Sequence, residues 1–145
     1  MQLAATWVCV LAGSTACRAD IIFVLGMFEN VNFERIKSLV SRYVNTLDIS
    51  DANSRVGLVT YSTTVKTAIH LNSYSSVASL QKNISLLTYS GSKYVNTSGA
   101  LAYVRTTMLS PSTGARYNVR KVVVLITAGE STDITSTQVN TVIIL

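Results

Sequence analysis

The chain has 145 residues, of which 48% are hydrophobic and 13% are charged, and its formal net charge is +5. This length suits a single domain with a sizeable core, and the low charge excludes an intrinsically disordered chain. One proline, two cysteines and one histidine exclude collagen-like sequence, a disulfide scaffold and most histidine-based metal sites.

An apolar run at residues 3–12 is too short to cross a bilayer and is typical of a signal-peptide core. No basic residue precedes the run, and a buried strand or helix is the alternative interpretation. Small residues permit cleavage after Ala16 or after Ala19. We therefore expect a leader within residues 1–19 and a secreted product.

Strand and helix patterns alternate through the remaining segment, residues 20–145. Continuous apolar runs predict buried strands at 21–25, 56–61 and 121–127. An alternating segment predicts an antiparallel edge strand at 64–70. Apolar residues at three- and four-residue spacing predict helices over 33–47, 77–87 and 100–108. The alternation predicts an α/β fold with a doubly wound, mostly parallel sheet flanked by helices.

Ligands of such sheets bind beyond the carboxyl ends of the strands. The segment at 26–30 follows the first strand, and Ala128 and Glu130 follow the last predicted one. A helix start at 96–98 completes the expected crevice.

Five stretches resemble, in this order, a von Willebrand factor type A domain. They are ADIIFVLG at 19–26, SRVGLVTYST at 54–63, LNSYSS at 71–76, NTSGAL at 96–101 and GARYNVRKVVVLITAGESTD at 114–133. The resemblance is strongest to the A domains of collagen VI, fibril-associated collagens and matrilins. It implies a Rossmann-like fold and an extracellular role in adhesion.

The resemblance also implies where a metal-ion-dependent adhesion site would lie. The family's Asp-x-Ser-x-Ser, Thr and Asp ligands correspond here to Gly26, Phe28, Asn30, Thr97 and Ala128. Both carboxylates are replaced, and only Thr97 and Asn30 keep a side-chain oxygen. A dication without an anionic ligand loses its charge pairing, so we expect no bound metal and no cofactor.

Two carboxylates close to the motif, Glu29 and Glu130, are alternative ligands, although their positions need not point inward. Met27 and Phe28 beside Ala128 make the crevice apolar instead. Phe28 then either fills the vacated site or forms part of a contact surface.

The favoured function is a non-enzymatic extracellular interaction module, independent of metal, whose partners are matrix proteins such as collagens or other A-domain proteins. The alternatives are a metal-dependent adhesion domain with non-standard ligands, a hydrolase with His70 as base, and a fragment without independent function. His70 lies on the predicted edge strand and has no Ser-Asp pattern nearby, so we expect a surface residue and no catalytic site.

Compared with the family, the chain ends before the last strand-helix-strand units, which predicts an incomplete domain. The strand at 121–127 is then expected to expose an apolar edge, where a second copy could pair. Cys17 would find its disulfide partner beyond the chain, as the resemblance implies, whereas Cys9 would leave with the leader.

Two sequons begin at Asn83 and Asn96. Asn83 is expected on an exposed helix face, and a glycan on Asn96 would block the crevice, which favours Asn83. Arg116, Arg120 and Lys121 form a small basic cluster that is interpreted as solvated surface and not as a nucleic-acid site.

Overall fold

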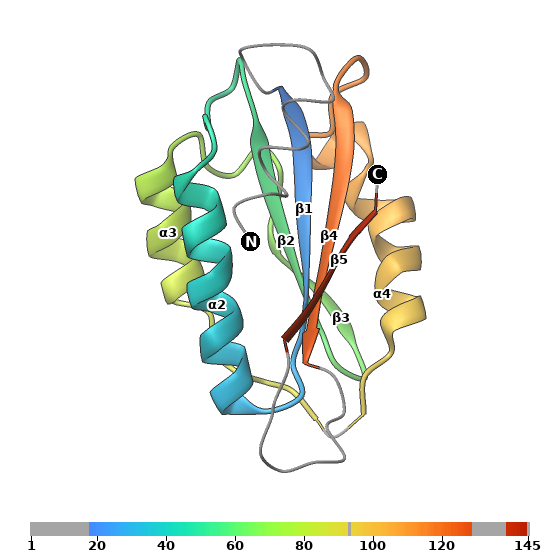
Figure 1. The fold of residues 1–145 in the computed structure, drawn as a ribbon. Helices are drawn as coiled ribbons and strands as arrows, with labels where there is room; N and C mark the ends of the chain where they lie inside the picture. Colours follow the sequence, from blue (N-terminus) through green and yellow to red (C-terminus); the bar gives the residue numbers. More distant parts are fainter. Residues whose placement is uncertain (1–17, 93, 129–138, 145) are drawn as a thin grey trace.

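The computed structural model describes residues 18–92, 94–128 and 139–144, and it shows a central sheet between two helical layers (Figure 1). The described strands form one five-stranded sheet in the order β3-β2-β1-β4-β5. Their bounds are β1 (Ala19–Gly26), β2 (Arg55–Tyr61), β3 (Val65–Ile69), β4 (Arg120–Ala128) and β5 (Val139–Ile144). β1 pairs in parallel with β2 and β4, whereas β3 and β5 run antiparallel to their neighbours. The predicted α/β sheet with a parallel centre is confirmed.

Helices cover both faces of the sheet (Figure 1). α2 (Asn30–Asn45) and α3 (Val77–Ser85) lie on one face, and α4 (Thr97–Tyr103) lies on the other. Ile21, Phe23 and Leu25 of β1 belong to the core on the α2 side. Ile22 and Val24 belong to the core on the α4 side. Burial on both faces explains the continuous apolar run of this strand.

α2 forms because its apolar residues recur on one side. Phe33, Ile36, Val40 and Val44 have no exposed surface. Burial of each such side chain stabilises the fold by about 1.5–3 kcal/mol. The helix begins three residues earlier and ends two residues earlier than predicted, and Thr46 closes it by donating its backbone N–H to the carbonyls of Tyr43 and Val44.

A buried lysine joins the two helices of this layer. Lys37 of α2 is 8% exposed, and its Nζ donates to the carbonyls of Ser85 and Leu87 at 3.3 and 2.8 Å. A cation at these carbonyls also compensates the negative end of the α3 dipole.

The predicted helix at 100–108 begins earlier, at Thr97, and continues from α4 into a π-helical turn at Val104–Met108. In this turn the N–H of Leu109 donates to the carbonyl of Val104 at 3.0 Å. Met108 has no exposed surface and packs in the core on this face of the sheet. The wider turn therefore ends the helix with an apolar residue directed at the sheet.

The sheet edge beyond β4 corrects one prediction. β5 pairs with β4 in a register that runs from Val123↔Ile144 to Ala128↔Val139. The expectation that 121–127 exposes an apolar edge is wrong. β5 already occupies the edge at which a second copy of the chain was expected to pair. An apolar run near the end of the sequence is equally compatible with an antiparallel strand, whose backbone forms hydrogen bonds with the edge and so protects it.

Residues 1–17 of the proposed leader, with Cys9 and Cys17, lie outside the described residues, and so does Glu130. Within those residues, no helix combines the length and apolar character that crossing a membrane requires.

Candidate functional site

The candidate site lies where β1 and β2 end and where α2 and α4 begin (Figure 1). Gly26 is the last residue of β1, and the following N–H, of Met27, donates to the carbonyl of Tyr61 at 2.9 Å. The two strand ends are therefore joined one residue beyond the ladder, which fixes the start of the next loop.

Phe28, Glu29 and Asn30 follow this bond and lead into α2. Phe28 is half-buried, whereas Glu29 and Asn30 are exposed. Glu29 precedes the first helical residue, and its Oε2 accepts from Nδ2 of Asn32 at 3.2 Å. This carboxylate thus lies at the positive end of the helix dipole, where a negative charge is favourable.

Thr97, the retained family position, is the first residue of α4. Asn96 caps this helix, because its Oδ1 accepts from the N–H of Gly99 at 2.9 Å and from Oγ of Ser98 at 3.1 Å. The backbone N–H of Asn96 donates to the carbonyl of Ser62 at 2.8 Å. The start of α4 is therefore anchored just beyond the end of β2.

Tyr61 fills the centre of the site. It has no exposed surface, and its hydroxyl lies 3.2 Å from Oγ1 of Thr97. A Cβ atom on Gly26 would lie 3.1 Å from the Tyr61 hydroxyl and 3.3 Å from Oγ1 of Thr127. The tyrosine hydroxyl therefore packs against the place from which a carboxylate of residue 26 would project.

Both interpretations of Phe28 from the sequence, as the filling residue or as part of a contact surface, leave out Tyr61. In the sequence, Tyr61 is the last residue of an apolar strand, which gives no sign of a special role. The feature of the sequence that could have indicated its role is its hydroxyl group. A tyrosine at the end of a buried strand needs a hydrogen-bond partner for that hydroxyl close to the strand terminus.

Among the residues that the structure describes here, the donor set at the family's ligand positions does not fit a hard divalent cation. Mg²⁺ binds through carboxylates and other oxygen ligands. Gly26, Phe28 and Ala128 carry no side-chain oxygen, and Thr97 shares its hydroxyl with Tyr61. Within the described ranges, no group of three or more His, Cys, Asp or Glu side chains could hold a metal ion.

The loop between α3 and α4 packs over the same end of the sheet. The Tyr89 hydroxyl donates to the carbonyl of Phe28 at 2.8 Å, and the Tyr89 ring lies 6.2 Å from that of Phe33. Gly91 approaches the carbonyl of Met27 so closely that no Cβ atom fits there. Further along this loop, Tyr94 is 73% exposed. The loop thus places an exposed aromatic ring on the segment that packs beside Phe28.

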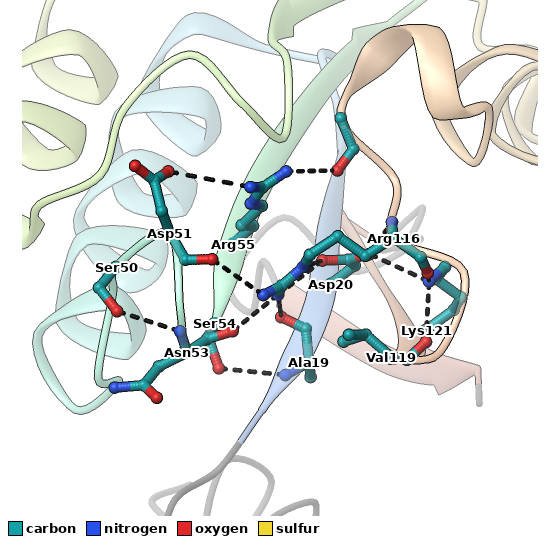
Figure 2. Close-up of polar contacts among 11 residues, drawn as sticks. Ala19, Asp20, Ser50, Asp51, Asn53, Ser54, Arg55, Arg116, Val119 and Lys121 are labelled. Carbon is teal, nitrogen blue, oxygen red and sulfur yellow. Dashed lines mark hydrogen bonds and ion pairs between the residues drawn. The ribbon is translucent and has the colours of Figure 1, made fainter.

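At the opposite end of the sheet, Asp20 is fully buried between two cations (Figure 2). Arg116 contacts Oδ1 of Asp20 through Nη2 at 2.8 Å and through Nε at 2.9 Å. The Nζ of Lys121 lies 3.0 Å from Oδ2 of Asp20. The backbone N–H of Arg116 also donates to Oδ2, at 2.7 Å. Four donors on one carboxylate offset the cost of its burial.

Arg116 also ties the neighbouring loop to β1, as Figure 2 shows. Its guanidinium donates to the carbonyls of Ala19, Asp51 and Asn53 at 3.3, 3.3 and 2.7 Å. Its side chain is only 13% exposed. The interpretation of the basic cluster as solvated surface is therefore wrong for Arg116, because Asp20 holds it inside the fold.

The other singled-out residues lie apart from the site. His70 is exposed and follows β3, as expected for a surface residue. Asn83 lies on α3 but is half-buried and not exposed, and its Nδ2 donates to the carbonyl of Ser79 at 2.8 Å. Asn96 is exposed.

Comparisons with known proteins agree with this geometry. Matrilin-1 of Homo sapiens is 32% identical over 124 residues, which cover 83% of this chain and 25% of matrilin-1. The collagen alpha-6(VI) chain of Mus musculus is 33% identical over 130 residues, which cover 86% of this chain and 6% of the collagen. The chain therefore spans a quarter or less of the length of these two relatives.

A solved structure shows the same fold. Proximal thread matrix protein 1 from the mussel byssus matches with a TM-score of 0.73 and 25% identity, over 81% of this chain and 32% of that chain. The model of the von Willebrand factor type A domain matches residues 20–144. The parallel sheet centre, the helices on both faces and these matches lead to one conclusion: the chain belongs to the von Willebrand factor type A domain family.

Proposed function

We propose that this domain is a non-enzymatic, secreted module that binds extracellular matrix proteins without a metal ion. Its relatives include matrilins and collagen chains, which supports a role in matrix protein contacts. The observation that carries metal independence is the buried Tyr61 hydroxyl, which packs over Gly26 and bonds Thr97. A Cβ atom at residue 26 would require the Tyr61 hydroxyl to shift by a few tenths of an ångström, so a carboxylate there would crowd the tyrosine in this position.

The contact surface in this proposal consists of Phe28, Glu29 and Tyr94. Phe28 is half-buried, Glu29 is exposed and Tyr94 is 73% exposed, so each of the three offers surface to solvent. Aromatic side chains supply large contact area at protein interfaces, and a charged rim gives specificity. The partners that this surface suits are collagens or other A-domain proteins.

Binding to immobilised collagens and matrilins, measured in Mg²⁺ and in EDTA, tests the proposal. We expect the same affinity in both buffers. Tyr94→Ser and Phe28→Ser should each weaken binding at least about tenfold, as expected for central aromatic contacts. Tyr117→Ser is the matched control, since Tyr117 is 100% exposed but precedes β4 at the opposite end of the sheet. Binding that disappears in EDTA would instead support the metal-dependent alternative.

A further inference from the structure

Ala19 is an integral part of the folded sheet. It is the first residue of β1, pairs with Arg120 and is 1% exposed. Its N–H donates to Oγ of Ser54 at 3.3 Å, and its carbonyl accepts from Arg116 at 3.3 Å (Figure 2). The peptide bond between Ala19 and Asp20 therefore lies inside the hydrogen-bonded core of the domain.

A chain that began at Asp20 would lose these contacts and gain a charge. The Asp20 carboxylate is fully buried and already shared by Arg116 and Lys121, at 2.8 and 3.0 Å. A free α-amino group is mostly protonated at neutral pH. Three cations would then surround one carboxylate where little water reaches them, which is an unfavourable arrangement.

We infer that a signal peptidase cuts this chain between Ala16 and Cys17, so that Ala19 stays in the mature protein. Water adds to the Ala16 carbonyl and the amide C–N bond breaks, which leaves a carboxylate on Ala16 and an amine on Cys17. Cys17 and Arg18 then separate the new amine from β1, and Arg18 is exposed. The inference needs the leader to be a signal peptide, and it is independent of what the domain binds.

Intact mass and amino-terminal sequencing of the secreted product test this directly. The full 145-residue chain is expressed in a secreting animal cell line with its own first residues. We expect a product that begins at Cys17. A product that begins at Asp20, or one that retains Met1, overturns the inference.

Two variants separate the candidate bonds. Cys17→Phe places a bulky residue three positions before the Ala19–Asp20 bond and keeps Ser14 and Ala16 for the other site. We expect unchanged yield and a product that begins at residue 17.

Ala16→Leu blocks the proposed bond and changes nothing in the mature chain. We expect the secreted yield to fall about tenfold, and any product that begins at Asp20 to melt at least about 5 °C below the wild type. An Asp20 product with wild-type yield and wild-type Tm would contradict the inference.

Discussion

The hydroxyl of Tyr61 lies 3.2 Å from the hydroxyl of Thr97, and this contact joins the end of β2 to the start of α4. Tyr61 has no exposed surface, so its hydroxyl cannot turn to solvent. Thr97, which stands at the position that the resemblance assigns to a metal ligand, thus contacts a buried tyrosine. Stability at this end of the sheet should depend on that pair.

A double-mutant cycle on the pair measures its strength. We expect Tyr61→Phe to cost about 1 kcal/mol of unfolding free energy, since one hydrogen bond is lost. Thr97→Val should cost about 1–3 kcal/mol, because it deprives a buried hydroxyl of its partner. The double variant should lose less than the sum of the two. Urea unfolding gives all three values, and simple additivity would show that the hydroxyls do not interact.

Gly26→Asp should destabilise the domain without creating a metal site. A Cβ atom on residue 26 lies 3.1 Å from the Tyr61 hydroxyl, so we expect overpacking of about 1–3 kcal/mol. Gly26→Ala is the steric control, and it should cost less, because it adds no buried carboxylate. Thermal unfolding with and without Mg²⁺ is the measurement. A rise in the Tm of Gly26→Asp with Mg²⁺ would show that Tyr61 leaves room for a metal.

The sequence patterns predict the sheet and helices well, because continuous apolar strands and three-to-four spacing report burial directly. They cannot show that Asp20 is buried, since the residues that neutralise it, Arg116 and Lys121, are about a hundred positions away. They also give no indication of the role of Tyr61. The alternation of side chains along β2 places its ring on the α4 face of the sheet but does not show which residue its hydroxyl contacts. Long-range polar contacts are the part that local patterns miss.

Asp20→Asn should be the most damaging of these substitutions. It leaves Arg116 and Lys121 largely buried, with side chains 13% and 29% exposed, and without a countercharge. Removal of one partner from such a network typically costs about 3–5 kcal/mol. Asp51→Asn is the matched control, because Asp51 is 79% exposed and lies 4.0 Å from Arg55. We expect the control to cost less than about 0.5 kcal/mol. Equal losses in urea unfolding would mean that burial does not set the strength of these pairs.

Asn96 should serve both as a helix cap and as the preferred glycosylation site. Because a glycan on Asn96 would block the crevice, the binding measurements are made after enzymatic removal of glycans. Its Oδ1 caps α4 through the N–H of Gly99, and the residue is exposed, whereas Asn83 is half-buried and donates its Nδ2 to Ser79. This geometry reverses the preference for Asn83 that the sequence suggests.

Three variants of the secreted chain separate the two roles of Asn96. Asn96→Asp and Asn96→Ala should both lower the mass by one glycan, and Asn83→Gln should leave the mass almost unchanged. After enzymatic removal of glycans, Asn96→Ala should be about 1 kcal/mol less stable, whereas Asn96→Asp keeps an oxygen that can accept the cap bond. If only Asn83→Gln removes a glycan, exposure in the folded domain does not decide which sequon is used. If Asn96→Asp is as unstable as Asn96→Ala, the cap bond contributes little to α4.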